Sequence, residues 1–350
     1  MKIAIITDTH FGARNDNQNF SDFFFKFYEE VFFPTLVERE ITTCIHMGDV
    51  MDRRKYVSYK TATDFRQGFI NRFKELNIDL HITVGNHDTY YKNTSEVNSM
   101  EELAGYGSIY TSPKVVDFDG TPILLMPWIN ANNYNESIKA LKTAKADILM
   151  GHLEIAGFAM TGQGMVNAEG WDKESFSRFE TVFSGHFHHK NDDGQIFYLG
   201  TPYEIYWNDC DDPKGFHIFD TSTRELERIL NPYTIFSKIY YDDSQNDYSK
   251  YEVEKYKDKY VKLIVVNKKD LYGFDKFTDR LLRADCHEVK IIEDFSELDA
   301  SNVSDDIVEN TEDTITLLDK YIDELDITLS KDRLKTTMKS LYNEAQDLEL

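Results

Sequence analysis

Short apolar runs recur along the first 225 residues, and stretches with helical spacing separate several of them. In one such stretch, Ala62, Phe65, Phe69, Phe73 and Leu76 follow the three-to-four-residue spacing that one buried face of a helix requires. Alternation of strand-like runs with helical segments is typical of an α/β domain. The runs that predict strands are KIAII, TTCIHM, LHITV, PILLMPW, ADILM, ETVFS, IFYLG and GFHIF.

A Phe-rich segment, FSDFFFKFYEEVFF, directly precedes Pro34. Proline has no N–H to donate, and its ring collides with the preceding helical turn. We therefore expect Pro34 to end or kink a helix formed by this segment. The stripe from Phe65 to Leu76 is expected to lie in the core, because its spacing is that of a buried helix face.

A second, smaller unit follows the α/β domain, which we place at residues 1–225. Within 226–295 the order is strand-like FSKIYY, strand-like KYVKLIVV, helical FDKFTDRLLRA and strand-like EVKIIE. Residues 296–310, SELDASNVSDDIVEN, are acidic and rich in serine and aspartate, which is typical of a linker. Residues 311–350 show helical patterns.

Two apolar stripes predict a pair of short helices in residues 311–350. Ser330 lies between them and is expected to cap the second helix at its N-terminus. Helices this short are marginally stable alone in water. Either the two helices pack on each other or on the preceding unit, or they bind a partner helix. The stripes are Ile315, Leu318, Ile322 and Leu325, then Leu334, Met338, Leu341 and Ala345.

The composition is that of a folded protein, since 41% of the 350 residues are hydrophobic and 24 are Phe. No apolar stretch approaches the roughly 18 residues of a membrane-spanning helix, and the N-terminal run is too short for a secretory signal. The three cysteines, Cys44, Cys210 and Cys286, form no CxxC pair and no disulfide framework. We expect a soluble protein of a reducing cytoplasm, without a membrane partner.

The formal net charge of −23 is unevenly distributed. Residues Glu293 to Leu350 hold 17 acidic and 5 basic side chains, which is about half of the excess negative charge. A basic footprint, the usual sign of nucleic-acid binding, is absent. A nucleic-acid substrate would therefore need local basic residues, bound cations or a partner protein to supply the attraction.

Five of the apolar runs are followed at once by side chains that bind metals. In open α/β sheets, ligands bind beyond the carboxyl ends of the strands, so five such ends would converge on one place. Glycine before four of the segments lets the backbone come close to that place. The segments are Asp8-Thr9-His10, Gly48-Asp49-Val50-Met51-Asp52, Gly85-Asn86-His87-Asp88, Gly151-His152 and Gly185-His186-Phe187-His188.

The possible ligands in these segments are too numerous for one ordinary ion. Seven donors suit two ions that share a bridging carboxylate. Two metal ions about 3.5–4 Å apart are a recurring device for attacking phosphate esters. Mixed imidazole and carboxylate ligation favours Mn, Fe or Zn over Mg. The seven donors are Asp8, His10, Asp49, Asn86, His152, His186 and His188.

The motifs D-x-H, G-D-x-x-D, G-N-H-D, G-H and G-H-x-H, in that order, resemble those of the calcineurin-like metallophosphoesterases. The resemblance covers roughly residues 1–220, and only the five motifs together are specific. Within this family the chain most resembles the nuclease subunits of double-strand-break repair nuclease–ATPase complexes, of the bacterial SbcCD type and of T-even bacteriophages. The segments LMPW, YLGTPYEIYW and DPKGFHIFD carry that likeness, as do EITTCIHMGDV, VGNHD followed by YKN, VDFDG and SGHFH.

The resemblance implies a four-layer α/β sandwich, a small α+β capping domain at 226–295 and a C-terminal helical hairpin. It implies DNA phosphodiester hydrolysis in end processing, recombination and repair, with two divalent ions and manganese as the expected metal. It further implies a homodimer, paired through helices near 65–76 and 95–104. The expected partner is an SbcC-type coiled-coil ATPase held by 311–350, in the cytoplasm of the host if the chain is phage-encoded.

The family's functional residues transfer onto matching positions of this chain. Asp8, His10, Asp49 and His188 resemble the first metal site. Asp49, Asn86, His152 and His186 resemble the second, with Asp49 as the bridge. His87 matches the catalytic histidine, which would stabilise charge or protonate the leaving oxygen. Asp88 is expected to orient and charge the His87 ring.

Several alternatives remain open from the sequence. Arg53 and Arg54 could contact DNA phosphate or be ordinary surface charge. The Tyr90-Tyr91-Lys92 segment could touch bases or sugar, although core or dimer packing is favoured. His189 is a departure from the family pattern. Four other histidines are expected to be structural: His46, His81, His217 and His287.

Two other functions fit the same fold. The chain could be another phosphoesterase, such as a phosphoprotein phosphatase or a cyclic-nucleotide phosphodiesterase, but a capping domain and helical tail are not needed for small substrates. It could also be a non-catalytic scaffold, but such members would lose His and Asp ligands first, and here the ligand set is full.

Overall fold

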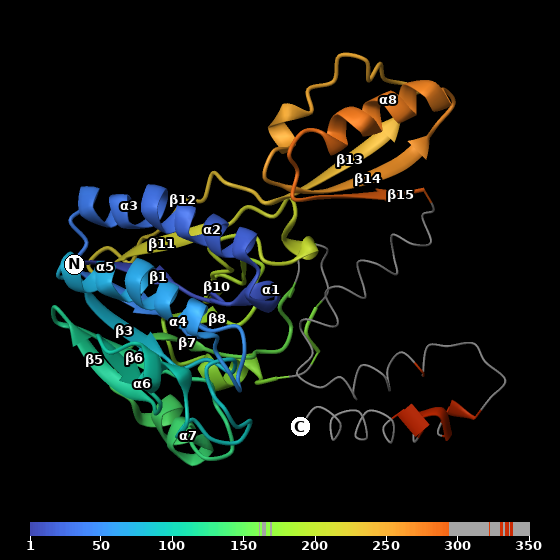
Figure 1. Ribbon diagram of the computed structural model, residues 1–350. Helices are drawn as coiled ribbons and strands as arrows, with labels where there is room; N and C mark the ends of the chain where they lie inside the picture. Colours follow the sequence, from blue (N-terminus) through green and yellow to red (C-terminus); the bar gives the residue numbers. More distant parts are fainter. Residues whose placement is uncertain are drawn as a thin grey trace.

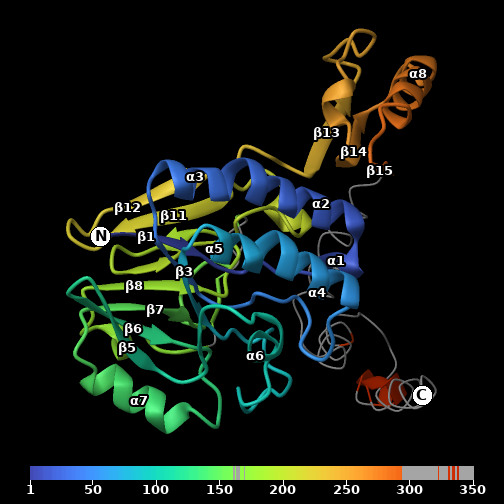
Figure 2. The same ribbon diagram turned by 60° about the vertical axis from the view of Figure 1, so that its left-hand side comes forward.

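The structure is a computed structural model that describes residues 1–160, 162, 166–168, 170–293, 322, 330, 331, 333–335, 337 and 338. Its main body contains two six-stranded sheets, and a separate three-stranded sheet belongs to a smaller unit (Figure 1). Helices cover the outer faces of the two large sheets, which gives the four layers that the family resemblance implies (Figure 2).

The first sheet has the order β12-β11-β1-β2-β3-β4. Strands β1, β2, β3 and β4 are parallel neighbours, whereas β11 pairs antiparallel with β1. The strands are β1 (Lys2–Ile6), β2 (Thr43–His46), β3 (Asp79–Thr83), β4 (Ser108–Tyr110), β11 (Gly215–Asp220) and β12 (Leu226–Leu230).

The second sheet has the order β5-β6-β7-β8-β10-β9. Its central strands β6, β7, β8 and β10 are parallel, and β5 and β9 close the two edges in antiparallel orientation. The strands are β5 (Lys114–Phe118), β6 (Thr121–Met126), β7 (Ile148–His152), β8 (Thr181–Gly185), β9 (Asn191–Asp192) and β10 (Ile196–Tyr198).

The two sheets pack face to face through side chains that alternate along the strands. Ile3 and Ile5 of β1 join Ile123 and Leu125 of β6 in the core between the sheets. The residues that alternate with them, such as Ala4, face the helices on the other side. Both faces of β1 are therefore buried, which explains why its run is apolar at every position from Ile3 to Ile6.

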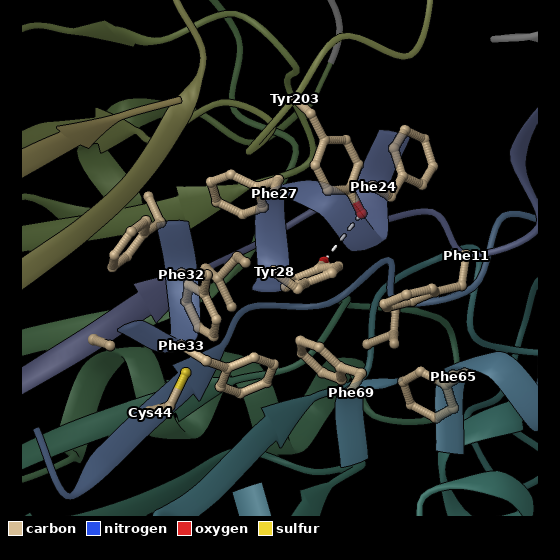
Figure 3. Close-up of a cluster of buried hydrophobic side chains, with 14 of the residues drawn as sticks. Phe11, Phe24, Phe27, Tyr28, Phe32, Phe33, Cys44, Phe65, Phe69 and Tyr203 are labelled. Carbon is tan, nitrogen blue, oxygen red and sulfur yellow. Dashed lines mark hydrogen bonds between the residues drawn. The ribbon is translucent and has the colours of Figure 1, made fainter. Parts of the chain in front are cut away.

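Two long helical runs cover the first sheet, and α7 (Tyr134–Thr143) covers the second. The stripe from Phe65 to Leu76 predicted from the sequence lies in the core, where Phe65, Phe69 and Phe73 are fully buried. Figure 3 shows Phe65 and Phe69 in a cluster of aromatic rings. The runs consist of α2 (Gln18–Phe27), a π-helical turn (Tyr28–Phe32) and α3 (Phe33–Glu38), then α4 (Tyr59–Phe65), a π-helical turn (Arg66–Ile70) and α5 (Asn71–Glu75).

Pro34 does not end the first of these runs. It lies in the first turn of α3, directly after a π-helical turn in which the Phe33 N–H donates to the Tyr28 carbonyl. The irregularity is the π-helical turn at Tyr28–Phe32, directly before the proline. The Phe-rich segment thus continues as helix on both sides of a local widening.

The smaller unit is a three-stranded parallel sheet, β13 (Phe236–Asp242), β14 (Tyr260–Asn267) and β15 (Glu288–Ile292), in that order. Helix α8 (Leu271–Leu282) packs on one face through Phe274, Phe277 and Leu281. Figure 1 shows this unit standing apart from the two large sheets. From β13 to β15 the elements follow the predicted order of strand, strand, helix and strand. The predicted start of this unit at residue 226 is wrong for Leu226–Leu230, which form β12 of the first large sheet because they pair with β11.

Shorter elements are α1 (Ala13–Asp16), α6 (Ser99–Leu103) and 3-10 turns at Lys173–Phe176, Trp207–Asp209 and Glu254–Tyr256.

The predicted linker at 296–310 lies outside the described residues, as does most of the helical pair at 311–350. At the start of the second predicted helix, the Arg333 N–H lies 3.4 Å from Ser330 Oγ, and the Leu334 N–H donates to the Ser330 carbonyl. These are the contacts expected of an N-cap residue. Among the described helices, none has the length and apolar character to cross a membrane.

Candidate metal centre

The ends of five strands carry the predicted ligands, as the spacing of the motifs requires. Strands β1, β2 and β3 of the first sheet lead into Asp8-x-His10, Asp49 and Asn86. Strands β7 and β8 of the second sheet end at or lead into His152, His186 and His188. The structure brings the side chains together in two groups, Asp8 with His10 and His188, and Asp49 with His152 and His186.

The backbone at these strand ends is strained. Asp8, His10, Asp49 and His186 all have positive φ, at 52°, 43°, 52° and 85°. Residues other than glycine seldom adopt this region, and such residues cluster at functional sites because the surrounding structure must hold them there. The turns aim the side chains of both sheets into one place.

Two of the motif glycines permit the close approach of neighbouring loops. A Cβ on Gly85 would lie 2.2 Å from the backbone nitrogen of Asp49, and a Cβ on Gly185 would lie 2.0 Å from Thr7 Oγ1. Neither distance is possible for a real side chain, so glycine is required at both positions. This is the structural reason why glycine precedes Asn86 and His186.

In the first group, two imidazoles face each other. His10 Nε2 and His188 Nε2 lie 3.2 Å apart, and the two rings have centroids separated by 4.9 Å. The candidate ligand atoms of Asp8, His10 and His188 all lie within 4.8 Å of one another. Asp52 Oδ1 lies 3.4 Å from His10 Nδ1, on the far side of the ring. That carboxylate would orient the imidazole if its Nε2 binds a metal.

In the second group, nitrogen and oxygen atoms of four side chains lie close to one another. His152 Nδ1 donates to the Met47 carbonyl at 2.9 Å, so in the neutral ring Nε2 carries a lone pair. That Nε2 lies 2.8 Å from Asn86 Oδ1 and 3.2 Å from Asp49 Oδ2. Asn86 Oδ1 is also 3.1 Å from His186 Nδ1. A cation between these atoms would satisfy them together.

The electrostatics of the two groups are those of a buried site that needs positive charge. Burial alone lowers the pKa of His152, but the Asp49 carboxylate reverses this and raises the pKa to about 9. Burial raises the pKa of Asp8 to about 6. Burial, with the nearby charges of His10 and Lys214, holds the pKa of His188 well below its usual range. Burial thus disfavours the protonated form of His188, and a histidine that binds a metal must be unprotonated.

The donor set fits two divalent cations. Asp8 and Asp49 are fully or almost fully buried, and no lysine or arginine pairs with either in the described part of the chain. Asp49 Oδ2 lies 3.2 Å from His152 Nε2. The Asp49 charge also adds to the rise in the pKa of Asp8, which burial causes first, and of His10, which the hydrogen bond to Asp52 causes first. Buried carboxylates and imidazoles that converge in this way are the ligand set of Mn, Fe or Zn sites.

His87 lies beside the first group, with its ring edge-on to His10 at 5.0 Å between centroids. Its Nδ1 lies 2.6 Å from the carbonyl oxygen of Asp52, and its backbone N–H donates to Asp49 Oδ1 at 2.8 Å. With Nδ1 donating to a backbone carbonyl, Nε2 is the ring nitrogen left for chemistry.

Asp88 does not orient the His87 ring, and that interpretation of the sequence is wrong. Its Oδ1 accepts the N–H groups of Val50 and Met51 at 2.9 and 3.0 Å, and its Oδ2 accepts the Gly85 N–H at 2.9 Å. The fully buried carboxylate thus ties the Asp49 loop to the Asn86 loop. The His87 ring is instead oriented by the carbonyl oxygen of Asp52.

Two arginines and two tyrosines are the weaker candidates for contact with DNA. Both Nη atoms of Arg53 bind within the protein, to Asp16 Oδ2 at 3.0 Å and Asn15 Oδ1 at 2.9 Å, which favours a structural role. Arg54 lies over the Trp128 ring at 5.1 Å. Tyr90 and Tyr91 are 40% and 50% exposed, so they are not core residues of a single chain, and their packing in a dimer or contact with DNA stays a prediction.

The remaining histidines lie outside the two ligand groups. His46 is fully buried, and its Nδ1 accepts the Gly48 N–H at 3.2 Å. His81 Nδ1 lies 2.8 Å from the Tyr110 hydroxyl, and His287 packs on Tyr260. His217 lies buried in β11. His189 Nδ1 lies 3.1 Å from Asp212 Oδ1.

Three residues near the ligands were not singled out from the sequence. Tyr206 lies parallel to the His188 ring, with centroids 5.4 Å apart and an interplanar angle of 9°. The Tyr203 hydroxyl donates to the Thr9 carbonyl at 2.6 Å, between the ligands Asp8 and His10. Lys214 donates to the His188 carbonyl at 2.9 Å. All three belong to segments that marked only the family resemblance.

Comparison with known proteins agrees with this geometry. Residues 1–190 match the model of a family described as calcineurin-like phosphoesterase. The chain is 32% identical over 352 residues to exonuclease subunit 1 of Enterobacteria phage T4, covering 99% of this chain and 99% of that protein.

Solved structures show more distant likeness. An archaeal phosphodiesterase is 15% identical, with a TM-score of 0.33, over 66% of this chain and 100% of its own. A dimetal phosphatase from Danio rerio is 10% identical, with a TM-score of 0.37, over 62% of this chain and 91% of its own. The family match over residues 1–190 and the full-length T4 relative together show that the chain belongs to the calcineurin-like phosphoesterase family.

Proposed function

We propose that the chain is the metal-dependent DNA nuclease subunit of a nuclease–ATPase complex. The observation that carries the proposal is the meeting of Asp8, His10 and His188 with Asp49, His152 and His186 at the strand ends. The relative from phage T4, which is named an exonuclease subunit, supports DNA as the substrate and a second protein as partner. End processing in recombination and repair is the corresponding role.

The residues have distinct parts in the proposed reaction. Asp8, His10 and His188 would hold one ion, Asn86, His152 and His186 the other, and Asp49 both. Such a pair of ions supplies positive charge for the phosphoryl oxygens and makes water a nucleophile at neutral pH. His87 presents Nε2 to the same space, where a proton on this nitrogen can pass to the leaving sugar oxygen. Asp52 and Asp49 fix His87 from its ring and backbone sides.

The negative net charge does not oppose this function. About half of the excess lies in Glu293 to Leu350. Two divalent ions would reverse the local charge where the phosphate sits. The ATPase partner would supply further DNA affinity, and a homodimer would present two such sites. The complex would act in the cytoplasm of a phage-infected cell.

Strict dependence on divalent metal is the first expected result. Treatment with a chelator should remove hydrolysis of both a small phosphodiester and end-labelled DNA, and added Mn²⁺ should restore it. A phosphoprotein phosphatase would instead cleave a phosphomonoester preferentially, so a phosphoserine peptide is the comparison substrate. Activity that survives chelation, or that no divalent ion produces, would count against the site.

Docking of the ATPase is expected to depend on residues 311–350. A chain that ends at Glu293 keeps all three sheets and should keep Mn²⁺-dependent hydrolysis of a small phosphodiester. It should lose ATPase binding and ATP-stimulated DNA degradation, because the amphipathic stripes would be gone. Co-purification with the partner ATPase measures this, and full-affinity binding of the shortened chain would place the docking surface elsewhere.

A further inference from the structure

The loop that carries His186 and His188 is held from behind by a buried lysine. Lys214 is 4% exposed, and its ammonium donates to the His188 carbonyl at 2.9 Å. The same nitrogen contacts Asp209 Oδ1 at 2.6 Å and Asp212 Oδ2 at 2.9 Å. Burying a cation costs free energy unless the cation is paired, and here two carboxylates lie within hydrogen-bonding distance of the ammonium. The His188 backbone is thus tied to an interior ion cluster.

The same ion cluster also positions the aromatic ring that lies beside His188. Asp209 uses its second oxygen, Oδ2, to accept the N–H groups of Ile205 and Tyr206, both at 2.9 Å. This holds Tyr206 where its ring stacks on the imidazole of His188 at an angle of 9°. One buried carboxylate therefore fixes both the lysine behind the His188 backbone and the aromatic wall beside its ring.

Neighbouring contacts restrict the loop at further points. The Thr201 N–H donates to the same His188 carbonyl at 3.1 Å. His189 Nδ1 lies 3.1 Å from Asp212 Oδ1, the other carboxylate of the ion cluster. Two successive residues of the loop are thus bound to one cluster. Because these contacts restrict both the backbone and the ring of His188, the imidazole keeps one orientation. In that orientation His188 Nε2 lies 3.2 Å from His10 Nε2.

We propose that Lys214 is a positioning residue for the ion held by Asp8, His10 and His188, acting with Asp209 and Tyr206 through the backbone and ring of His188. The inference rests on the proposed two-metal function. It separates the two ions, because the contacts of the cluster reach His188 and not the Asn86 and His152 side of the site.

Binding of Mn²⁺ to the full-length chain tests this directly. In Lys214→Met, the affinity of one of the two ions should fall by about 10- to 100-fold, as when the outer partners of metal ligands are removed. The second ion should bind as in the wild type. Calorimetry gives the two affinities, and electron paramagnetic resonance of Mn²⁺ should show loss of the coupled two-ion signal at limiting metal.

Lys190→Met is the matched control. Lys190 lies in the same loop and pairs with Asp192 at 3.1 Å on the surface, so its replacement removes one lysine charge without touching the cluster. Two ions should bind to this variant with wild-type affinities. If Lys190→Met weakens the same ion as strongly as Lys214→Met, the effect is one of net charge, and the positioning role is overturned.

A second variant guards against loss of folding. Lys214→Met leaves Asp209 and Asp212 buried without their cation, which can unfold a protein. Asp209→Asn keeps the shape and one acceptor oxygen for Ile205 and Tyr206, removes the charge, and should weaken the same ion less severely. Circular dichroism and thermal denaturation establish which variants are folded.

The outcomes separate this inference from the proposed function. If the wild type binds no Mn²⁺, the proposed function fails first. If the wild type binds two ions and the folded variants of Lys214 and Asp209 bind both with unchanged affinity, the positioning role is wrong. A folded variant that weakens both ions equally would assign Lys214 a general structural role and would also overturn the inference.

Discussion

Replacing Asp49 with alanine is expected to release both metal ions and to remove measurable phosphodiesterase activity. Asp49 is 2% exposed, lies 3.2 Å from His152 Nε2 through Oδ2, and raises the pKa of both Asp8 and His10. Its loss would remove charge from both groups at once. Loss of a general acid lowers the rate by about 10²–10⁴-fold, and the fall for this variant should be larger. Metal content by mass spectrometry is measured beside the rate.

Two further variants make the Asp49 result specific. Asp49→Asn keeps an oxygen that can accept the His87 N–H, which now donates to Oδ1 at 2.8 Å, and so separates loss of charge from loss of that contact. Asp117→Ala removes an exposed carboxylate that accepts the Gly120 N–H in the β5–β6 turn and should leave both ions in place. Two ions retained by a folded Asp49→Ala would contradict the bridging role.

Replacing His87 with alanine is expected to cut turnover by about 10²–10⁴-fold and to leave two ions bound. The His87 ring reaches Asp52 through Nδ1 and is not a member of either ligand group. Its backbone N–H, which contacts Asp49, remains in the variant. The loss should appear in kcat, because the proton is delivered in the transition state.

The control for His87 is His287→Ala. His287 packs on Tyr260 in the smaller unit, at 5.3 Å between ring centroids, and has no contact with the ligands. This variant should keep its turnover and both ions. If His87→Ala loses metal as Asp49→Ala does, His87 is a ligand or a support for one, and its role as a proton donor is wrong.

The sequence predicts the ligand set because a few consecutive residues are enough to show where a strand ends. Each apolar run is short, and the residue that follows it must lie at the carboxyl edge of a sheet. The spacing of the motifs alone does not reveal that these edges belong to two sheets, with Asn86 from the first and His152 from the second meeting at 2.8 Å. That contact depends on the packing of Ile3, Ile5, Ile123 and Leu125 between the sheets.

The supporting residues could not be predicted, because their partners are distant in the chain or lie on the backbone. Asp88 follows His87 in the sequence, which suggested a contact with its ring. In the fold the Asp88 carboxylate instead meets backbone N–H groups of Val50 and Met51, 38 and 37 residues away. Lys214 and His188 are 26 residues apart, and their contact is with a carbonyl oxygen that has no sequence signal.

The backbone conformations of the site were equally hidden. Asp8, His10, Asp49 and His186 adopt positive φ although none is glycine. Local preference opposes this conformation, so it exists only because contacts made by the folded protein hold it. The hydrogen bonds from the His186 N–H to both oxygens of Asp8, at 3.0 and 3.1 Å, are one such contact.

The most direct test of the two-metal claim is anomalous diffraction from crystals of the full-length chain grown with Mn²⁺. The account predicts two manganese peaks, one among Asp8, His10 and His188, the other among Asn86, His152 and His186, with Asp49 contacting both. Absence of manganese from this place in metal-saturated crystals, or a single ion that does not contact Asp49, would contradict it.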